Sequence, residues 1–432
     1  MNSSSKINNP LHTMLLCGIL LIPFMSLPVM PSDYRPISVF FLFPVSVFVY
    51  LKYIARSKVK KDILILSLFV LFSVVHSLIL QPFLTSLRAI VPLLLGFFSY
   101  IGINYYFQRT KVITVFNKLT KLFVFIAILG IIEILAMKNL IPYSIKLFIG
   151  EVFSGKVSSR IQLITMEGSW AAKIIIFSIP IYVYHYCKNG YFYLSFYILF
   201  LLFLLIFSLE GFAILGFALM FRFFPVLIKL LFFKYRLKYY LYGLISVMII
   251  PLLILLVLNT ESGYQISRLY KFVDAQSFSK ILSLDGSTFI RIVYPALGFF
   301  IFWNNPFGVG LGGYAESFNS HISTISIKYS HFEEVVGDIK TVSADPKNLY
   351  SKIFSETGII GVLLFMSFLF LQLRYLKYNI NYLPKYKLFF LANFFLAITC
   401  VIQFGSFAYL PFWFAFALNS AVYFKFRKGL DI

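Results

Sequence analysis

The longest polar stretch of the chain runs from Leu258 to Ser351 and contains the glycine run NNPFGVGLGGY at residues 304–314. The sequence on either side consists mainly of apolar runs of about 20 residues, the length of a helix that crosses a bilayer. The pattern therefore predicts a bundle of membrane spans interrupted by one large polar loop. Chemistry that takes place outside the lipid is expected in that loop.

The composition excludes a water-soluble protein. The chain has 432 residues, of which 60% are hydrophobic and only 12% are charged, whereas soluble domains carry about 25% charged residues. The net charge of +22 comes from lysines and arginines that gather in alternate loops, which is the positive-inside pattern of membrane proteins. The charge therefore indicates topology, and no nucleic-acid partner is expected.

The apolar runs predict about twelve spans in an all-α polytopic fold, with both termini in the cytoplasm. They are expected near 12–30, 36–54, 62–80, 83–106, 119–137, 169–187, 190–208, 210–232, 239–258, 349–373, 386–404 and 406–424.

The organisation is predicted to be a single helical membrane domain, 1–432, whose subdomain 259–348 lies outside the cytoplasm between spans nine and ten. Within this loop, Phe289 to Trp303 is apolar apart from Arg291 but too short to span. It is therefore expected to be an interfacial or re-entrant helix. Ile141 to Phe153 is expected to be a shorter amphipathic piece.

No metal site and no cofactor are expected. Cys17, Cys187 and Cys400 show no paired spacing, and no HxxxH element is present. The glycine run lacks the GK[ST] of a nucleotide loop, so on spacing alone it is best interpreted as a turn. Its Gly310 and Gly312 permit close backbone approach.

Several charged residues near the outer ends of spans are candidates for a polar cavity. Arg160, Arg291 and Arg88 are candidates for phosphate binding, because a guanidinium binds phosphate oxygens in a bidentate way. The alternative is that each side chain only extends to water at the interface. Glu167, Asp345 and Glu356 are the candidate general bases.

Ordered motifs carry a family resemblance. Arg160 precedes an acidic-Gly-Ser-aromatic-Ala-Ala element at residues 167–172, and the loop then contains NPFGVGLGG, followed by PxNLY from Pro346 and ExGxxG from Glu356. Together these motifs, over roughly residues 155–365, resemble the O-antigen ligase and polymerase superfamily of bacterial envelopes.

The resemblance implies a GT-C-like fold in the bacterial inner membrane, with its active site facing the periplasm or cell exterior. It implies a glycosyltransferase that takes its donor and acceptor oligosaccharides from undecaprenyl diphosphate carriers, without a nucleotide sugar. Arg160 and Arg291 would hold the diphosphate, and an acidic or histidine base would deprotonate the acceptor hydroxyl. Glu167 is the first candidate, followed by Asp345 and Glu356. A chain-length regulator and a flippase are the implied partners, besides the lipid bilayer itself.

One departure bears on the choice within the superfamily. Ligases of this group typically carry His before the Asn of the PxN element, where this chain has Lys347 before Asn348. Because a lysine is protonated at neutral pH and is a poor base, the polymerase of O-antigen or capsule synthesis is favoured. A ligase, and a flippase or transporter of lipid-linked oligosaccharide, remain the alternatives, although a transporter would be expected to show related halves.

Overall fold

The computed structural model describes residues 10–28, 36–56, 59–158, 160–206, 208, 210–220, 277–323, 325, 327 and 329–429. All regular elements in these ranges are helices, and the chain is an all-α polytopic membrane protein, as the sequence predicts. Helices suit a bilayer because they satisfy every backbone polar group within one segment.

The helices before the large loop are α1 (Pro10–Leu20), α2 (Ser38–Ala55), α3 (Lys61–Leu80), α4 (Phe83–Arg109), α5 (Val112–Met137), α6 (Ser144–Ser154), α7 (Gly168–Asn189) and α8 (Leu194–Ile206), followed by Glu210–Met220. Those of the loop are α12 (Phe278–Leu284), α13 (Gly286–Asn304), α14 (Tyr314–Ile322) and α15 (Glu333–Thr341). After the loop come α16 (Leu349–Lys352), a π-helical turn η1 (Ile353–Thr357), α17 (Gly358–Tyr382), η2 (Pro384–Tyr386), α18 (Lys387–Cys400), η3 (Val401–Gln403) and α19 (Leu410–Phe426).

The described ranges hold seven helices that are long and apolar enough to cross a membrane, and the bent pair Leu194–Ile206 with Glu210–Met220 would make an eighth. The expected span 210–232 runs beyond the described residues after Met220. The expected span 239–258 lies outside them, as do three charged residues of the polar stretch Leu258–Ser351, namely Arg268, Lys271 and Asp274. The total of about twelve spans therefore stays a prediction.

One helix is longer than the sequence predicts. Helix α13 has 19 residues and is long and apolar enough to span, whereas the sequence predicts a helix only from Phe289 to Trp303, too short to span. The extra first turn forms because the Asp285 carboxylate accepts a hydrogen bond from the Thr288 backbone N–H at 2.6 Å. This N-cap satisfies a donor that the helix leaves unpaired.

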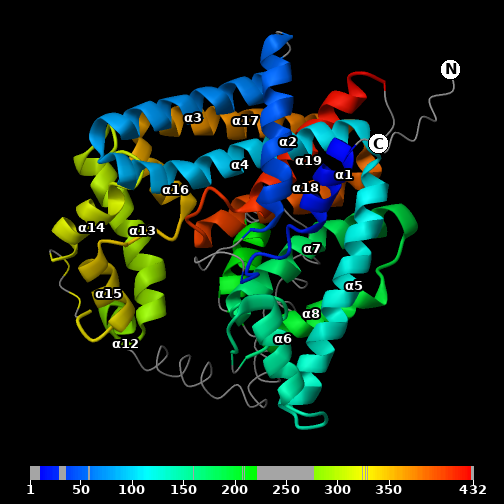
Figure 1. The fold of residues 1–432 in the computed structure, drawn as a ribbon, viewed down its shortest axis with the longest axis horizontal. Helices are drawn as coiled ribbons and strands as arrows, with labels where there is room; N and C mark the ends of the chain where they lie inside the picture. The colour runs from blue at the N-terminus through cyan, green and yellow to red at the C-terminus, as the bar shows by residue number, and fades with distance from the viewer. Residues whose placement is uncertain are drawn as a thin grey trace, which may run out of the picture.

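Helix α4 lies at the centre of the bundle. It packs against α2, α3 and α19, and α3, α4 and α17 run side by side (Figure 1). Gly96 allows the close approach to α19, because a Cβ at this position would overlap the Trp413 indole. Trp413 and Tyr100 are among the largest fully buried side chains.

The turns rich in lysine and arginine (the basic turns) come together at one end of the bundle. The Lys425 Nζ donates to the Thr110 carbonyl at 2.7 Å, and the Lys385 Nζ donates to the Lys188 carbonyl at 3.3 Å. Helix α7 starts away from this end and, with 22 residues, is about 33 Å long. Its first residue therefore lies about one bilayer thickness away from the basic turns.

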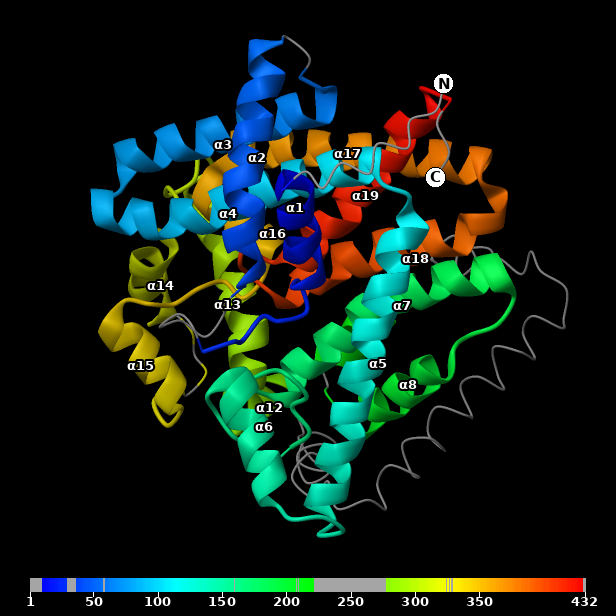
Figure 2. The ribbon, with the colours of Figure 1, turned by 45° about the vertical axis from the view of Figure 1, so that its right-hand side comes forward.

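The loop helices α12 to α15 gather at one side of the molecule (Figures 1 and 2). They share a small apolar core in which Tyr294 and Phe318 pack with ring centroids 4.5 Å apart. This core fixes α13, and with it Arg291, relative to α14 and α15.

A buried polar network joins α3, α4, α17 and α19. The Tyr100 hydroxyl donates to the Asp62 carboxylate and accepts from the Gln372 amide at 3.0 Å, and the Ser420 hydroxyl donates to the same carboxylate at 2.5 Å. Polar groups inside a membrane bundle need such partners, because lipid provides none.

Tyr100→Phe is expected to destabilise the protein by about 1–3 kcal/mol, because it leaves a buried carboxylate short of one donor. Thermal unfolding of the purified protein in detergent measures this as a lower midpoint. The matched control is Tyr197→Phe, where the side chain is 55% exposed. Equal midpoints for the two variants would contradict the role assigned to the network.

Candidate functional site

A polar cavity of about 320 Å³ opens at the end of the bundle opposite the basic turns. Segments distant in sequence meet there: the start of α7, the start of the Glu210–Met220 helix, α13, α15, the loop before α16 and the loop before α19. The lining residues are Glu167, Trp170, Lys173, Glu210, Ser287, Ile290, Arg291, Glu334, Asp345, Lys347, Gln403, Phe404, Gly405 and Ser406.

Glu210 binds two cations at the wall of this cavity. Its carboxylate lies 2.5 Å from the Lys173 Nζ through one oxygen and 3.3 Å from the Arg291 guanidinium through the other, and only 3% of the side chain is exposed. The Lys173 ammonium also lies 4.7 Å from the centre of the Phe404 ring. A buried carboxylate is costly unless nearby cations compensate its charge. Because the two cations come from α7 and α13, the pairing joins these helices to the helix that begins at Glu210.

Arg291 is only partly committed to Glu210. Its other terminal nitrogen donates to the Ser287 hydroxyl at 2.6 Å, one turn earlier on α13. The side chain remains 31% exposed toward the cavity. Its exposed edge can therefore bind an anionic group that enters the cavity.

Glu167 is exposed and lies immediately before the first residue of α7. The Ser169 hydroxyl donates a hydrogen bond to its carboxylate. The preceding loop is held by Glu133 on α5, whose carboxylate accepts from the backbone N–H groups of Gln162 at 2.9 Å and Leu163 at 3.1 Å. These contacts fix where Glu167 lies at the cavity.

Asp345 forms an ion pair with Lys352 at 2.5 Å. Burial acts to raise the pKa of Asp345, but the nearby Lys352 and Lys347 charges and hydrogen bonds outweigh it, and the pKa is lowered. Asp345 therefore stays ionised at neutral pH and is a weak proton acceptor. A lowered pKa also means that the ion pair stabilises the fold above the ordinary pKa and is lost on strong acidification.

The backbone at Lys347 is unusual. Its φ is +55°, and its N–H donates to the Asp345 carboxylate at 3.3 Å. Gly405 faces this turn, and a Cβ there would lie 3.1 Å from the Lys347 nitrogen. The left-handed turn places Lys347 in the lining of the cavity, beside the loop that precedes α19.

Asn348 and Glu356 act within the local structure. The Asn348 side chain accepts from the Ser351 N–H at 3.0 Å and so caps α16. Glu356 lies in the π-helical turn η1 with 1% of its surface exposed, and its carboxylate faces the backbone N–H groups of Gly312 and Tyr314. Neither residue lines the cavity.

The glycine run ties the loop to the bundle through backbone N–H groups, and this contact is called the latch. The Val309 and Gly310 N–H groups donate to the carbonyls of Ser355 and Glu356, both at 2.9 Å, and the Leu311 N–H donates to the Ser77 hydroxyl at 2.6 Å. Gly310 and Gly312 have φ of +82° and +87°. In this arrangement they position the loop against α3, α4 and η1 and do not themselves line the cavity.

Gly358→Ala tests the latch. Gly358 has φ of +61°, and a Cβ there would overlap the Phe307 carbonyl group. The substitution is expected to lower the unfolding midpoint by the equivalent of more than about 1 kcal/mol. The control, Gly337→Ala, lies on a helix with open space around it and should be neutral or slightly stabilising. A midpoint for Gly358→Ala at or above that of the control would contradict the latch.

Two predicted phosphate ligands lie outside the cavity lining. The Arg160 guanidinium donates to the Ile206 carbonyl at 2.7 Å and packs beside Gly168, so it joins the end of α8 to the start of α7. Arg88 is exposed on the second turn of α4. The structure thus brings Glu167, Arg291, Asp345 and Lys347 together in one cavity lining, which includes neither of these two arginines.

Lys173 and Gly405 have no role that the sequence alone predicts. Lys173 is a cation within a predicted span, and the cost of such a residue is the available signal. Gly405 is recognised only from its contact with the Asp345 turn. No group of side chains in the described ranges has the arrangement of a metal site.

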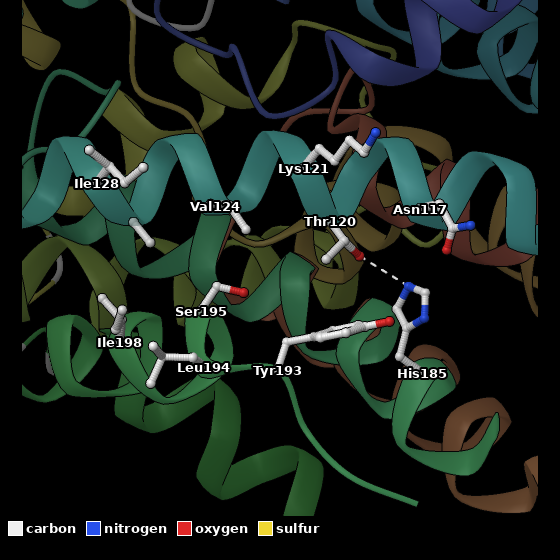
Figure 3. A pocket seen from close by; sticks show the side chains of 11 residues that line it. Asn117, Thr120, Lys121, Val124, Ile128, His185, Tyr193, Leu194, Ser195 and Ile198 are labelled. Atoms are coloured by element: carbon white, nitrogen blue, oxygen red, sulfur yellow. Dashed lines mark hydrogen bonds between the residues drawn. The ribbon is translucent and has the colours of Figure 1, made fainter. Parts of the chain in front are cut away.

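A larger cavity, of about 650 Å³, lies between α5, α7 and α8 (Figure 3). Its walls are mainly apolar, and the Thr120 hydroxyl and the His185 Nε2 are hydrogen bonded across it at 3.0 Å. None of the predicted site residues lines it. The cavity of about 320 Å³, which four of the predicted residues line, is therefore the candidate site.

A family model matches the part of the chain that contains the large loop. Residues 194–366 match the O-antigen ligase family model. The matched range includes Arg291, the glycine run, Asp345 and Lys347, and it begins after Glu167. It supports the O-antigen ligase and polymerase superfamily, and with it a membrane enzyme of lipid-linked polysaccharide synthesis. No curated protein matches the chain.

Proposed function

We propose that the protein is a polymerase that joins undecaprenyl-diphosphate-linked oligosaccharide repeat units into O-antigen or capsular polysaccharide at the periplasmic face of the inner membrane. The observation that carries this proposal is the cavity shared by Glu167, Arg291, Asp345 and Lys347. Such a reaction needs a proton acceptor and cations within one site, and the cavity offers both.

The location of the cavity supports an extracytoplasmic reaction. The basic turns gather at the opposite end of the bundle, and basic loops are retained in the cytoplasm. The cavity then faces the periplasm, where lipid-linked sugars are available and nucleotide sugars are not.

The proposed reaction forms one glycosidic bond and breaks one sugar–phosphate bond. The acceptor hydroxyl gives its proton to Glu167 as its oxygen attacks the anomeric carbon of the donor sugar. The bond from that carbon to the diphosphate oxygen breaks, and undecaprenyl diphosphate leaves. Glu167 later releases its proton to water.

Glu167 is favoured as the base over Glu210 and Asp345, because both of those carboxylates are engaged. Glu210 binds Lys173 and Arg291, and Asp345 is bound to Lys352 with a lowered pKa. Glu167 is exposed at the cavity and is oriented by the Ser169 hydroxyl. Correct orientation of a carboxylate toward the hydroxyl is what general base catalysis requires.

The cations are assigned to the leaving group. Negative charge grows on the diphosphate as the sugar–phosphate bond breaks, and preorganised cations lower the energy of that state. Arg291 offers its partly exposed guanidinium, and Lys347 lines the same cavity. Arg160, held at the Ile206 carbonyl, is assigned to supporting the α7 start beside them.

Arg291→Ala and Glu167→Gln are each expected to reduce polymerisation by at least about 100-fold, the usual scale for lost acid–base or charge stabilisation. The readout is the surface polysaccharide ladder in cells whose membranes contain normal amounts of the variant. Glu316→Gln, an exposed carboxylate on α14 outside the cavity, is the matched control. A normal ladder for both cavity variants would overturn the assignment.

A ligase is the second candidate, because the matching family model is described as O-antigen ligase. Lys347, in place of the histidine that the resemblance associates with ligases, favours the polymerase. Deleting the gene separates the two. Loss of a polymerase is expected to leave the lipid A core capped with one repeat, whereas loss of a ligase leaves a bare core and polymer still on its carrier. An unchanged ladder would contradict both.

A further inference from the structure

A second charged cavity, of about 370 Å³, lies at the basic end of the bundle. It is lined by Val49, Lys52, Tyr53, Arg56, Lys60, Tyr105, Gln108, Arg109 and Lys428. Five of these residues are cations, and within the described ranges no carboxylate lines the cavity. They come from the end of α2, the residue before α3, the end of α4 and the segment after α19.

Aromatic and amide groups hold two of these cations, Arg109 and Lys60, in place. The Arg109 guanidinium lies 3.6 Å from the centre of the Tyr105 ring. The Lys60 Nζ lies 4.2 Å from the centre of the Phe424 ring and donates to the Asn104 side-chain oxygen at 3.3 Å. These contacts orient the cations without neutralising them.

Among the described residues, no carboxylate forms an ion pair with any of the five cations. Burial lowers the pKa of Lys60 to about 7, with repulsion from Lys428 and Arg109 acting in the same direction and attraction by Asp62 opposing it. Asp62 does not line the cavity, and its carboxylate already accepts from Tyr100 and Ser420. An anion in the cavity would relieve this repulsion.

The tendency of basic residues to lie on the cytoplasmic side does not by itself explain why five cations line one cavity. Basic residues that only mark the cytoplasmic side can extend separately into water. Arg374 near the end of α17 is an example, because its guanidinium lies 4.9 Å from the ring of Phe370 on its own helix and it lines neither charged cavity. The five cations instead converge on one cavity.

We propose that this cavity binds the phosphate of an anionic lipid headgroup in the leaflet at the basic end of the bundle. Guanidinium and ammonium groups are the side chains that bind phosphate, and basic pockets between spans are known to bind such headgroups. The same turns of α2 expose Leu51 and Ile54, by 59% and 50%. Acyl chains attached to the bound phosphate can lie against this apolar face, which favours a lipid over a free phosphate.

The test uses the purified full chain in neutral detergent. Phosphatidylglycerol, phosphatidylcholine and inorganic pyrophosphate are each titrated while the unfolding midpoint is followed, and lipids that co-purify are quantified by mass spectrometry. Phosphatidylglycerol is expected to raise the midpoint of the wild-type protein, whereas phosphatidylcholine is not. In Arg56→Gln/Arg109→Gln, the concentration needed should rise about fivefold for each cation removed.

The matched control is Arg374→Gln/Lys377→Gln, which removes two cations from the basic end outside the cavity. It should respond to phosphatidylglycerol like the wild type and retain the same co-purified lipid. If the cavity variant does not fold, Arg109→Lys and Lys52→Gln carry the same titration. The former should bind more weakly than wild type because a lysine loses the bidentate geometry.

Three outcomes would overturn the proposal. Equal responses of the cavity and control variants would show that the cations act only as a diffuse surface charge. Equal stabilisation by phosphatidylcholine would remove the role of the negative headgroup. Stabilisation by pyrophosphate as strong as that by phosphatidylglycerol would assign the cavity to a free phosphate compound rather than to a lipid.

Discussion

The candidate site depends on one buried carboxylate shared by two cations. Glu210 holds Lys173 of α7 and Arg291 of α13 at its two oxygens, and all but 3% of its side chain is buried. Removing one member of such a group leaves the others uncompensated, which destabilises the contact among the three segments. The cavity between them owes its shape and its cations to this constraint.

Two further sets of hydrogen bonds position the other segments that line the cavity. The glycine run ties the loop to the turn η1 and to the α3 and α4 hairpin, and Glu133 holds the loop that leads to Glu167. In both, backbone N–H groups of a connecting segment donate hydrogen bonds to acceptors on the neighbouring helices, which keeps these segments ordered. The bundle thus supplies rigidity, and in the proposed reaction the loop supplies half of the chemistry.

Much of the fold is legible in the sequence, because apolar length and the distribution of lysine and arginine are set by the bilayer itself. The predicted spans 62–80, 83–106 and 169–187 correspond closely to α3, α4 and α7, whereas the start of α13 depends on a local cap at Asp285 rather than on apolar length. The site is harder to predict from the sequence, because it depends on contacts between residues that are far apart in the chain. Lys173 could not be predicted, since its partner Glu210 lies 37 positions away. Four sequence-based candidates nevertheless lie around one cavity: Glu167, Arg291, Asp345 and Lys347.

The shared carboxylate is tested most directly by a double-mutant cycle between Glu210 and Arg291. The quantity measured is the rate of glycosidic bond formation by purified protein supplied with lipid-linked repeat units. Glu210→Gln and Arg291→Ala should each slow the reaction, and the double variant should be no slower than Arg291→Ala alone, because both act through one ion pair. Losses that multiply, or wild-type rates in both single variants, would contradict the central role of this ion pair.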